Sequence, residues 1–182
     1  MLRNTAQAWG SVAKVLHWSM LGLIVVQVSL GWAADLWHLS PTKIELFIWH
    51  KSTGILLLLL AVLRIGWRLC NPAPQPPDGL PRWERAAGIA THVVLYVLIV
   101  AIPLSGWVIN SAANIPLNVF WLFPLPDITA PSKPLANLAA RVHFGLYIAV
   151  SGVLCLHVAA ALRHHFIRRN DVLVRMLPGG RP

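Results

Sequence analysis

Four apolar segments, each long enough to cross a lipid bilayer, constrain the fold of this chain more than any other feature. They occupy residues 15–34, 47–69, 88–110 and 140–166. About 20 residues of helix cross a hydrocarbon core of about 30 Å, and a helix satisfies its own backbone hydrogen bonds in lipid. Only 12% of the 182 residues are charged, against about 25% in soluble domains, which disfavours a very hydrophobic soluble core. We therefore predict an all-α integral membrane protein, a bundle of four transmembrane helices forming one membrane domain over residues 1–182.

The basic residues predict the orientation of the bundle. Eleven of them lie at the N-terminus, around the Pro-rich connection 71–81 or in the C-terminal tail: Arg3, Lys14, Arg64, Arg68, Arg82, Arg85, Arg163, Arg168, Arg169, Arg175 and Arg181. The other two loops and their flanks hold four, which are Lys43, Lys51, Lys133 and Arg141. Because Lys and Arg concentrate in cytoplasmic loops, both termini are expected in the cytoplasm. The net charge is +9. Because the basic residues flank apolar runs and form no basic stripe, nucleic-acid binding is not expected.

Neither cysteine chemistry nor a cleavable leader is expected. Cys70 and Cys155 lie in or at the end of apolar segments, where buried or interfacial thiols without chemistry are usual. The chain has no C-x-x-C-H motif for covalent haem attachment. The first apolar segment lacks a small-residue cleavage site and reads as a retained helix.

Histidines supply the chemistry that the apolar segments otherwise lack. Five of the eight lie within or at the ends of the spans: His17, His50, His92, His143 and His157. An ionisable side chain is costly in lipid and usually faces the bundle interior with a partner. With cytoplasmic termini, His17 and His92 lie near the inner surface, and His50 and His143 near the outer one. His157 follows His143 by 14 residues, about 21 Å of helix and almost four full turns, so both share one helix face.

The same spacing of 14 residues recurs on the other spans. Arg64 follows His50, Gly31 follows His17 and Gly106 follows His92 at that distance, while Gly54 lies one turn after His50. Glycines at these levels leave room for a flat macrocycle, and an arginine can pair with a propionate. The alternative for any single glycine is that a small residue lets two helices approach closely.

Paired imidazoles at two depths of the membrane favour two b-type haems, because a six-coordinate haem takes two imidazoles from facing helices. Zinc also binds histidine, but its sites usually include cysteine or carboxylate ligands. The acidic residues Asp35, Glu45 and Asp127 sit in or beside the outer loops. Metal transport, a proton relay and a structural role remain open at this stage.

The order of these segments resembles the bacterial cytochrome b561 family of inner-membrane di-haem cytochromes. The matching pieces are LHWSM around His17, WHKSTGI around His50, THVVLY around His92, RVHFGLY around His143, and CLHVAAALRHHF around His157 with the later RMLP. The resemblance covers nearly the whole chain. It implies that His17 and His157 hold a cytoplasmic-side haem b, and that His50 and His143 hold a periplasmic-side haem b. His92 lies at the level of His17 and is the alternative ligand there, or a hydrogen-bonding or quinone-adjacent side chain.

The resemblance also implies electron transfer between a periplasmic-side donor and a quinone, with ubiquinone as the expected substrate or bound partner. It admits an enzyme that oxidises superoxide to oxygen and passes the electron to ubiquinone. Lys51, with Lys133 and Arg141, can attract a small anion toward the outer haem, although snorkelling explains such charges as well. The alternatives are a membrane-anchor cytochrome that serves a partner dehydrogenase or electron carrier, and a haem-free transporter or scaffold. His164 and His165 are expected to be solvated interfacial residues, and His38 is assigned no role.

Overall fold

The computed structural model describes residues 1–77 and 79–180, and it is built on four long helices. These are α1 (Ser11–Leu36), α2 (Pro41–Cys70), α3 (Arg82–Ala112) and α4 (Lys133–Phe166). Each is long and apolar enough to cross a membrane, with a mean hydropathy of 1.5 to 2.2 in its most apolar window. The predicted bundle of four membrane-spanning helices is therefore confirmed.

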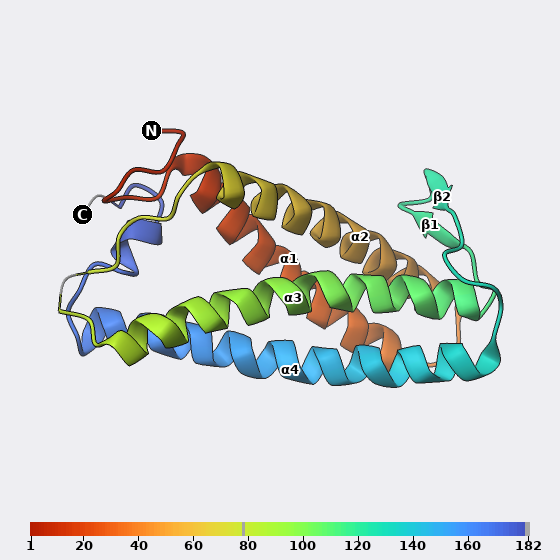
Figure 1. Ribbon diagram of the computed structural model, residues 1–182. Helices are drawn as coiled ribbons and strands as arrows, with labels where there is room; N and C mark the ends of the chain where they lie inside the picture. Colours follow the sequence, from red (N-terminus) through yellow and green to blue (C-terminus); the bar gives the residue numbers. More distant parts are fainter. Residues whose placement is uncertain (78, 181–182) are drawn as a thin grey trace.

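The helices pack as two pairs. Packing is most extensive between α1 and α2 and between α3 and α4, while α2 also contacts α3. Figure 1 shows α3 and α4 side by side, with the α1–α2 pair crossing them obliquely. Two small clusters form the interior, one around Met20, Leu57 and Ala61 and the other around Leu95 and its neighbours on α3 and α4.

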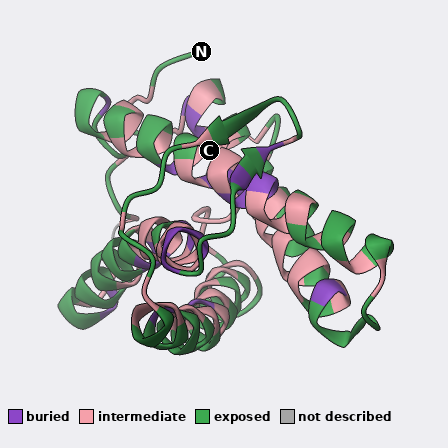
Figure 2. Cartoon of the chain, turned by 90° about the vertical axis from the view of Figure 1, so that its right-hand side faces the viewer, coloured by how far each residue is buried: buried purple, intermediate pink, exposed green. Residues whose placement is uncertain are grey.

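Most of the remaining apolar surface faces outward. Figure 2 shows exposed residues along the outer faces of the helices, and side chains as apolar as Leu156 are 69% exposed. In water such a surface would be unstable, because each apolar side chain gains free energy when it leaves water. Lipid tails cover it instead, so the bundle needs only a narrow interior.

The helices begin earlier than the hydropathy pattern predicts. Helix α2 starts at residue 41 instead of 47, because Ser40 caps it by accepting a hydrogen bond from the Lys43 N–H. Helix α4 starts at residue 133 instead of 140, and Ser132 accepts from the Leu135 N–H in the same way. Capping residues determine where a helix begins, whereas hydropathy reports only the part that lies in lipid. The helices therefore extend beyond the apolar core.

Both chain termini lie at one end of the bundle, which we call the termini end (Figure 1). The C-terminal tail folds back there onto α1, where Lys14 Nζ donates to the carbonyls of Leu177 and Gly180. Trp18 Nε1 donates to the carbonyl of Met176 at 2.9 Å. Arg181, counted among the basic residues of the tail, lies outside the described residues.

The opposite end, which we call the hairpin end, carries a two-stranded antiparallel sheet where the sequence analysis expected only a loop. Strands β1 (Leu117–Val119) and β2 (Phe123–Leu125) are joined by a tight turn. Phe120 and Trp121 occupy its centre in the left-handed region, with φ of 47° and 59°. Three residues connect the paired Val119 and Phe123, and the Leu122 N–H donates to the Val119 carbonyl at 2.9 Å. Two positive φ values at the centre of such a turn are a conformation that bulky side chains rarely adopt. Ser52 of α2 holds the turn by accepting a hydrogen bond from the Phe120 N–H at 2.8 Å.

Candidate functional site

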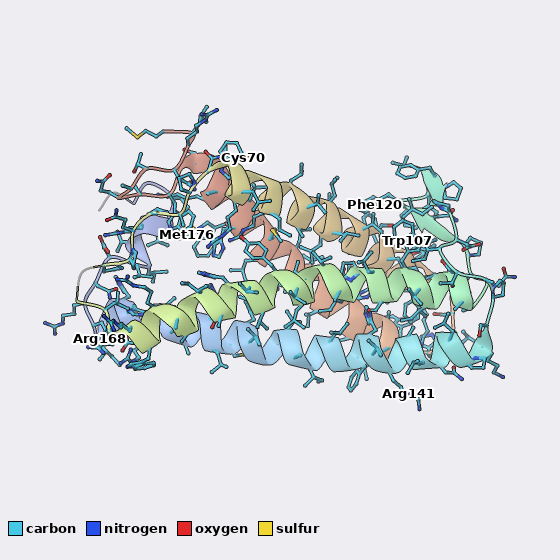
Figure 3. The ribbon with its side chains drawn as sticks, viewed as in Figure 1. Cys70, Trp107, Phe120, Arg141, Arg168 and Met176 are labelled. Carbon is cyan, nitrogen blue, oxygen red and sulfur yellow. The ribbon has the colours of Figure 1, made fainter. Side chains whose placement is uncertain are left out.

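The five membrane histidines form two groups, one toward each end of the bundle. In Figure 3 the hairpin end is marked by Phe120 and Trp107, and the termini end by Met176, Arg168 and Cys70. Side chains of His50 and His143 meet toward the hairpin end, whereas those of His17, His92 and His157 meet toward the termini end. The 14 residues between His143 and His157 on α4 place the two groups about 21 Å apart.

The hairpin-end pair consists of His50 from α2 and His143 from α4. Their ring centroids lie 6.3 Å apart with an interplanar angle of 71°. A bond from a metal to an imidazole nitrogen is about 2.0–2.1 Å long, so two rings on opposite sides of one metal have centroids about 6 Å apart. The observed separation therefore matches two axial ligands of a single metal.

Backbone carbonyls on neighbouring helices orient both rings of this pair. His50 Nδ1–H donates to the carbonyl of Gln27 on α1 at 3.1 Å, and His143 Nδ1–H donates to the carbonyl of Ile102 on α3 at 3.1 Å. A carbonyl only accepts, so the proton of each neutral ring sits on Nδ1. The free lone pair is left on Nε2, the nitrogen available to a metal, in the arrangement typical of metal-binding histidines.

Two polar side chains also contact these rings, and neither was identified from the sequence. Ser105 Oγ lies 2.9 Å from His143 Nδ1 and donates to the Ile102 carbonyl at 2.6 Å. The Gln27 amide donates to the His50 carbonyl at 2.9 Å and lies 3.4 Å from His50 Nε2. A glutamine in the middle of an apolar span was the available signal, since polar residues in lipid usually have a function.

Glycines leave the space that the two imidazoles occupy. A Cβ atom on Gly31 of α1 would lie 3.1 Å from His50 Cε1, and one on Gly106 of α3 would lie 3.5 Å from His143 Cε1. Each glycine lies one turn after the residue whose carbonyl accepts from the ring. Gly54 plays a related part, because a Cβ there would lie 3.0 Å from the Gln27 amide nitrogen. The spacing predicted that these glycines leave room for a macrocycle, and the protein atoms nearest to them are ring edges and an amide.

The termini-end group contains three rings. His17 of α1 and His157 of α4 have centroids 6.2 Å apart, nearly the separation of the hairpin-end pair. His92 of α3 lies closer to His157, at 5.3 Å, which is shorter than two ligands on opposite sides of a metal require. Arg64 of α2 donates to His17 Nδ1 at 2.9 Å, so the structure places this arginine beside the termini-end group. Its pairing with a propionate stays a prediction.

The other candidate residues lie outside both groups. Lys51 follows His50 on α2 and is half-buried, and within the described residues it makes no hydrogen bond or ion pair. The remaining histidines are His38, stacked on Trp37, His164, bonded to Asn170, and His165, packed edge-on against Phe166.

In the described part of the chain, no group of three or more His, Cys, Asp or Glu residues is placed to hold a metal ion. Structural zinc sites need four such ligands and catalytic zinc sites three. The ring centroids of His17 and His157, and those of His50 and His143, are 6.2 Å and 6.3 Å apart. These separations suit two ligands on opposite sides of one metal.

Comparison with known proteins agrees with this geometry. A sequence model described as "Prokaryotic cytochrome b561" matches residues 8–179. "Cytochrome b561 homolog 2" of Escherichia coli (strain K12) is 35% identical over 181 residues, 96% of this chain and 93% of the relative. "Cytochrome b561 homolog 1" of the same organism is 26% identical over 90% of this chain and 93% of the relative. "Probable superoxide oxidase CybB" of Yersinia pestis is 29% identical over 90% and 92%. The chain therefore belongs to the prokaryotic cytochrome b561 family, multi-pass bacterial membrane proteins that bind b-type haem and transfer electrons.

Proposed function

We propose that residues 1–182 form one membrane domain that holds two b haems, one in each histidine group. His50 and His143 are the ligands at the hairpin end, and His17 and His157 at the termini end. The observation that carries this proposal is the separation of the ring centroids, 6.3 Å and 6.2 Å, at two depths of the bundle. Both values match imidazoles on opposite sides of an iron.

The hydrogen bonds of the hairpin-end pair support the same assignment. Because the backbone carbonyls of Gln27 and Ile102 accept from Nδ1, each Nε2 would bind iron without first losing a proton. A haem bound there supplies a centre that gains and loses one electron while its ligands stay in place. The protein contributes by holding the two rings at the right separation and by excluding water from the site.

His17 is preferred to His92 as the partner of His157. Its ring has the separation that axial ligation requires, whereas the ring of His92 is about 1 Å too close. Arg64 donates to His17 Nδ1, a nitrogen that must carry a proton once Nε2 binds iron. With iron held at Nε2, Arg64 would no longer donate to Nδ1, and its guanidinium would be available to pair with an anionic group such as a haem propionate. His92 is then not a ligand, and it lies beside His157 as a hydrogen-bonding or quinone-adjacent side chain.

The two sites carry electrons across the inner membrane between a donor at the hairpin end and ubiquinone. The excess of basic residues around the termini end supports a cytoplasmic position for both termini, which makes the hairpin end periplasmic. One relative is named a "Probable superoxide oxidase", which supports superoxide as the donor. Lys51, one residue from His50, would add positive charge near that site.

A second candidate is a membrane-anchor cytochrome that takes electrons from a partner protein. The hairpin favours it, because Trp121, Leu122 and Phe123 are 53%, 78% and 52% exposed at the hairpin end. Exposed aromatic residues are frequent in protein interfaces as well as at the membrane surface. Turnover of superoxide and ubiquinone by the purified chain alone favours the oxidase, and its absence favours the anchor.

The test is the haem content of purified histidine variants, measured as pyridine haemochrome per chain. We expect about two haems in the parent protein and about one each in His50→Ala and His157→Ala, because the sites are about 21 Å apart and fill separately. The matched control is His38→Ala, which removes a histidine outside both groups and should retain two. A parent protein without the reduced bands of a low-spin b cytochrome would refute the proposal.

A further inference from the structure

A groove on the membrane-facing surface of the bundle lies between α2 and α3 near the termini end. It has a volume of about 360 Å³ and is lined by Ile65, Arg68, Leu69, Val93, Tyr96 and Val97. Its rim is accessible from the lipid, since Leu69 is 82% exposed, Val97 60% and Val93 56%. None of these residues belongs to the two histidine pairs.

The apolar residues form a strip that leads from the end of α2 toward the middle of the membrane. On α2, Ile65 lies one turn deeper than Leu69, and on α3, Val97 lies one turn deeper than Val93. The four-residue spacing within each pair spans about 6 Å along the helix axis. The strip is therefore apolar and runs parallel to lipid tails, as a binding site for a hydrocarbon chain requires.

Arg68 introduces a charge into this groove. Its guanidinium carbon lies 5.8 Å from the ring centre of Trp9 and 5.8 Å from that of Tyr96. Among the described residues it has no carboxylate partner and no hydrogen bond, because the described ion pairs involve Glu84 and Asp171 with other arginines. A guanidinium has five donors in one plane, and stacking on aromatic rings uses none of them. The edge of Arg68 is therefore free to bind an anion.

The position of Arg68 matches the level of lipid headgroups. It lies in the last turn of α2, two residues before the helix ends at Cys70. The same end of the bundle carries the exposed Arg82 and Arg85, which make its surface basic. Basic pockets between transmembrane helices at this level bind anionic lipid headgroups.

We propose that this groove binds one anionic phospholipid. The phosphate accepts hydrogen bonds from the edge of Arg68, a geometry in which guanidinium and phosphate are complementary. The Tyr96 hydroxyl supplies a second donor beside it. One acyl chain lies along the strip formed by Ile65, Leu69, Val93 and Val97. The proposal does not depend on the haem ligands or on the electron donor.

The experiment measures phosphatidylglycerol bound to the purified haem-loaded protein by native mass spectrometry, with phosphatidylcholine as the neutral comparison. For Arg68→Gln we expect the affinity for phosphatidylglycerol to fall about tenfold, since a charge-assisted contact is lost. The matched control is Arg85→Gln, which removes the same charge from an exposed position at the same end, outside the groove. Val97→Trp, which fills the groove, should also weaken binding, with an unchanged haem spectrum as the check of folding.

Three results would overturn the proposal. Equal weakening in Arg68→Gln and Arg85→Gln would show that diffuse surface charge holds the lipid. Unchanged lipid binding in Arg68→Gln, with a lowered midpoint potential of one haem, would show that Arg68 pairs with a propionate. Displacement of phosphatidylglycerol by a short-chain ubiquinone, with the same sensitivity to Val97→Trp, would assign the groove to the quinone. Bound lipid is read from the mass of the complex and haem from its absorbance, so failure of the proposed function would be seen separately.

Discussion

Removing the charge of Arg64 should lower the reduction potential of the termini-end haem. Its Nη2 lies 2.9 Å from His17 Nδ1. With the width of the imidazole and a metal–nitrogen bond of about 2 Å added, the guanidinium charge would lie about 8 Å from an iron held at Nε2. At an effective dielectric constant of about 20, two unit charges at this distance interact by about 2 kcal/mol. A positive charge stabilises the reduced form, which carries one less positive charge. Since 100 mV corresponds to about 2.3 kcal/mol per electron, Arg64→Gln should lower this potential by about 90 mV.

The hairpin-end haem provides an internal reference. Arg64 follows His50 by 14 residues on α2, about 21 Å along the helix. At that distance the same calculation gives about 0.8 kcal/mol, or about 30 mV, and salt reduces it further. The difference between the two potentials should therefore change by about 60 mV or more in the variant, relative to the parent protein.

The assay is an optical redox titration of the purified protein, resolved into two components. Arg64→Lys is the matched control, because it keeps a positive charge at the same position and should move the potential much less. Equal shifts of both components would mean that the variant alters the protein as a whole. Two unchanged potentials would remove Arg64 from the neighbourhood of the haem.

Three further predictions test individual contacts. The His157→Ala variant should lose about half of its haem and keep one low-spin component, and an unchanged content would refute its assignment as a ligand. Gly31→Leu should displace the neighbouring imidazole, which a Cβ alone would approach to 3.1 Å, and empty the hairpin-end site, whereas Gly22→Leu, with open space around it, should keep two haems. Ser52→Ala leaves the N–H of the hairpin turn without its acceptor and should cost about 1–3 kcal/mol in thermal unfolding experiments in detergent. The control Ser29→Ala removes only an exposed bond within its own helix, and an equal loss there would contradict the role of Ser52.

The sequence predicted the helices well because hydropathy reports directly on lipid. A residue such as Leu156 must be apolar wherever it meets lipid, so a window of about 20 residues locates each span. The helix ends were placed less well, because Ser40 and Ser132 lie outside the apolar runs and act through capping. The hairpin was missed because Phe120 and Trp121 are poor formers of its turn, and contacts with α2 hold them there.

The spacing along α4 determined by itself that His143 and His157 share one face and lie at two depths, because a helix converts sequence separation into height and angle. Only the tertiary structure decided that the Gln27 and Ile102 carbonyls accept from the rings, and that Gly31 makes room for one of them. Those contacts join different helices, and they depend on the rotation and crossing of each pair. Spacing in the sequence determines which face of a helix a residue occupies, but the packing of the helices determines which atoms its side chain contacts.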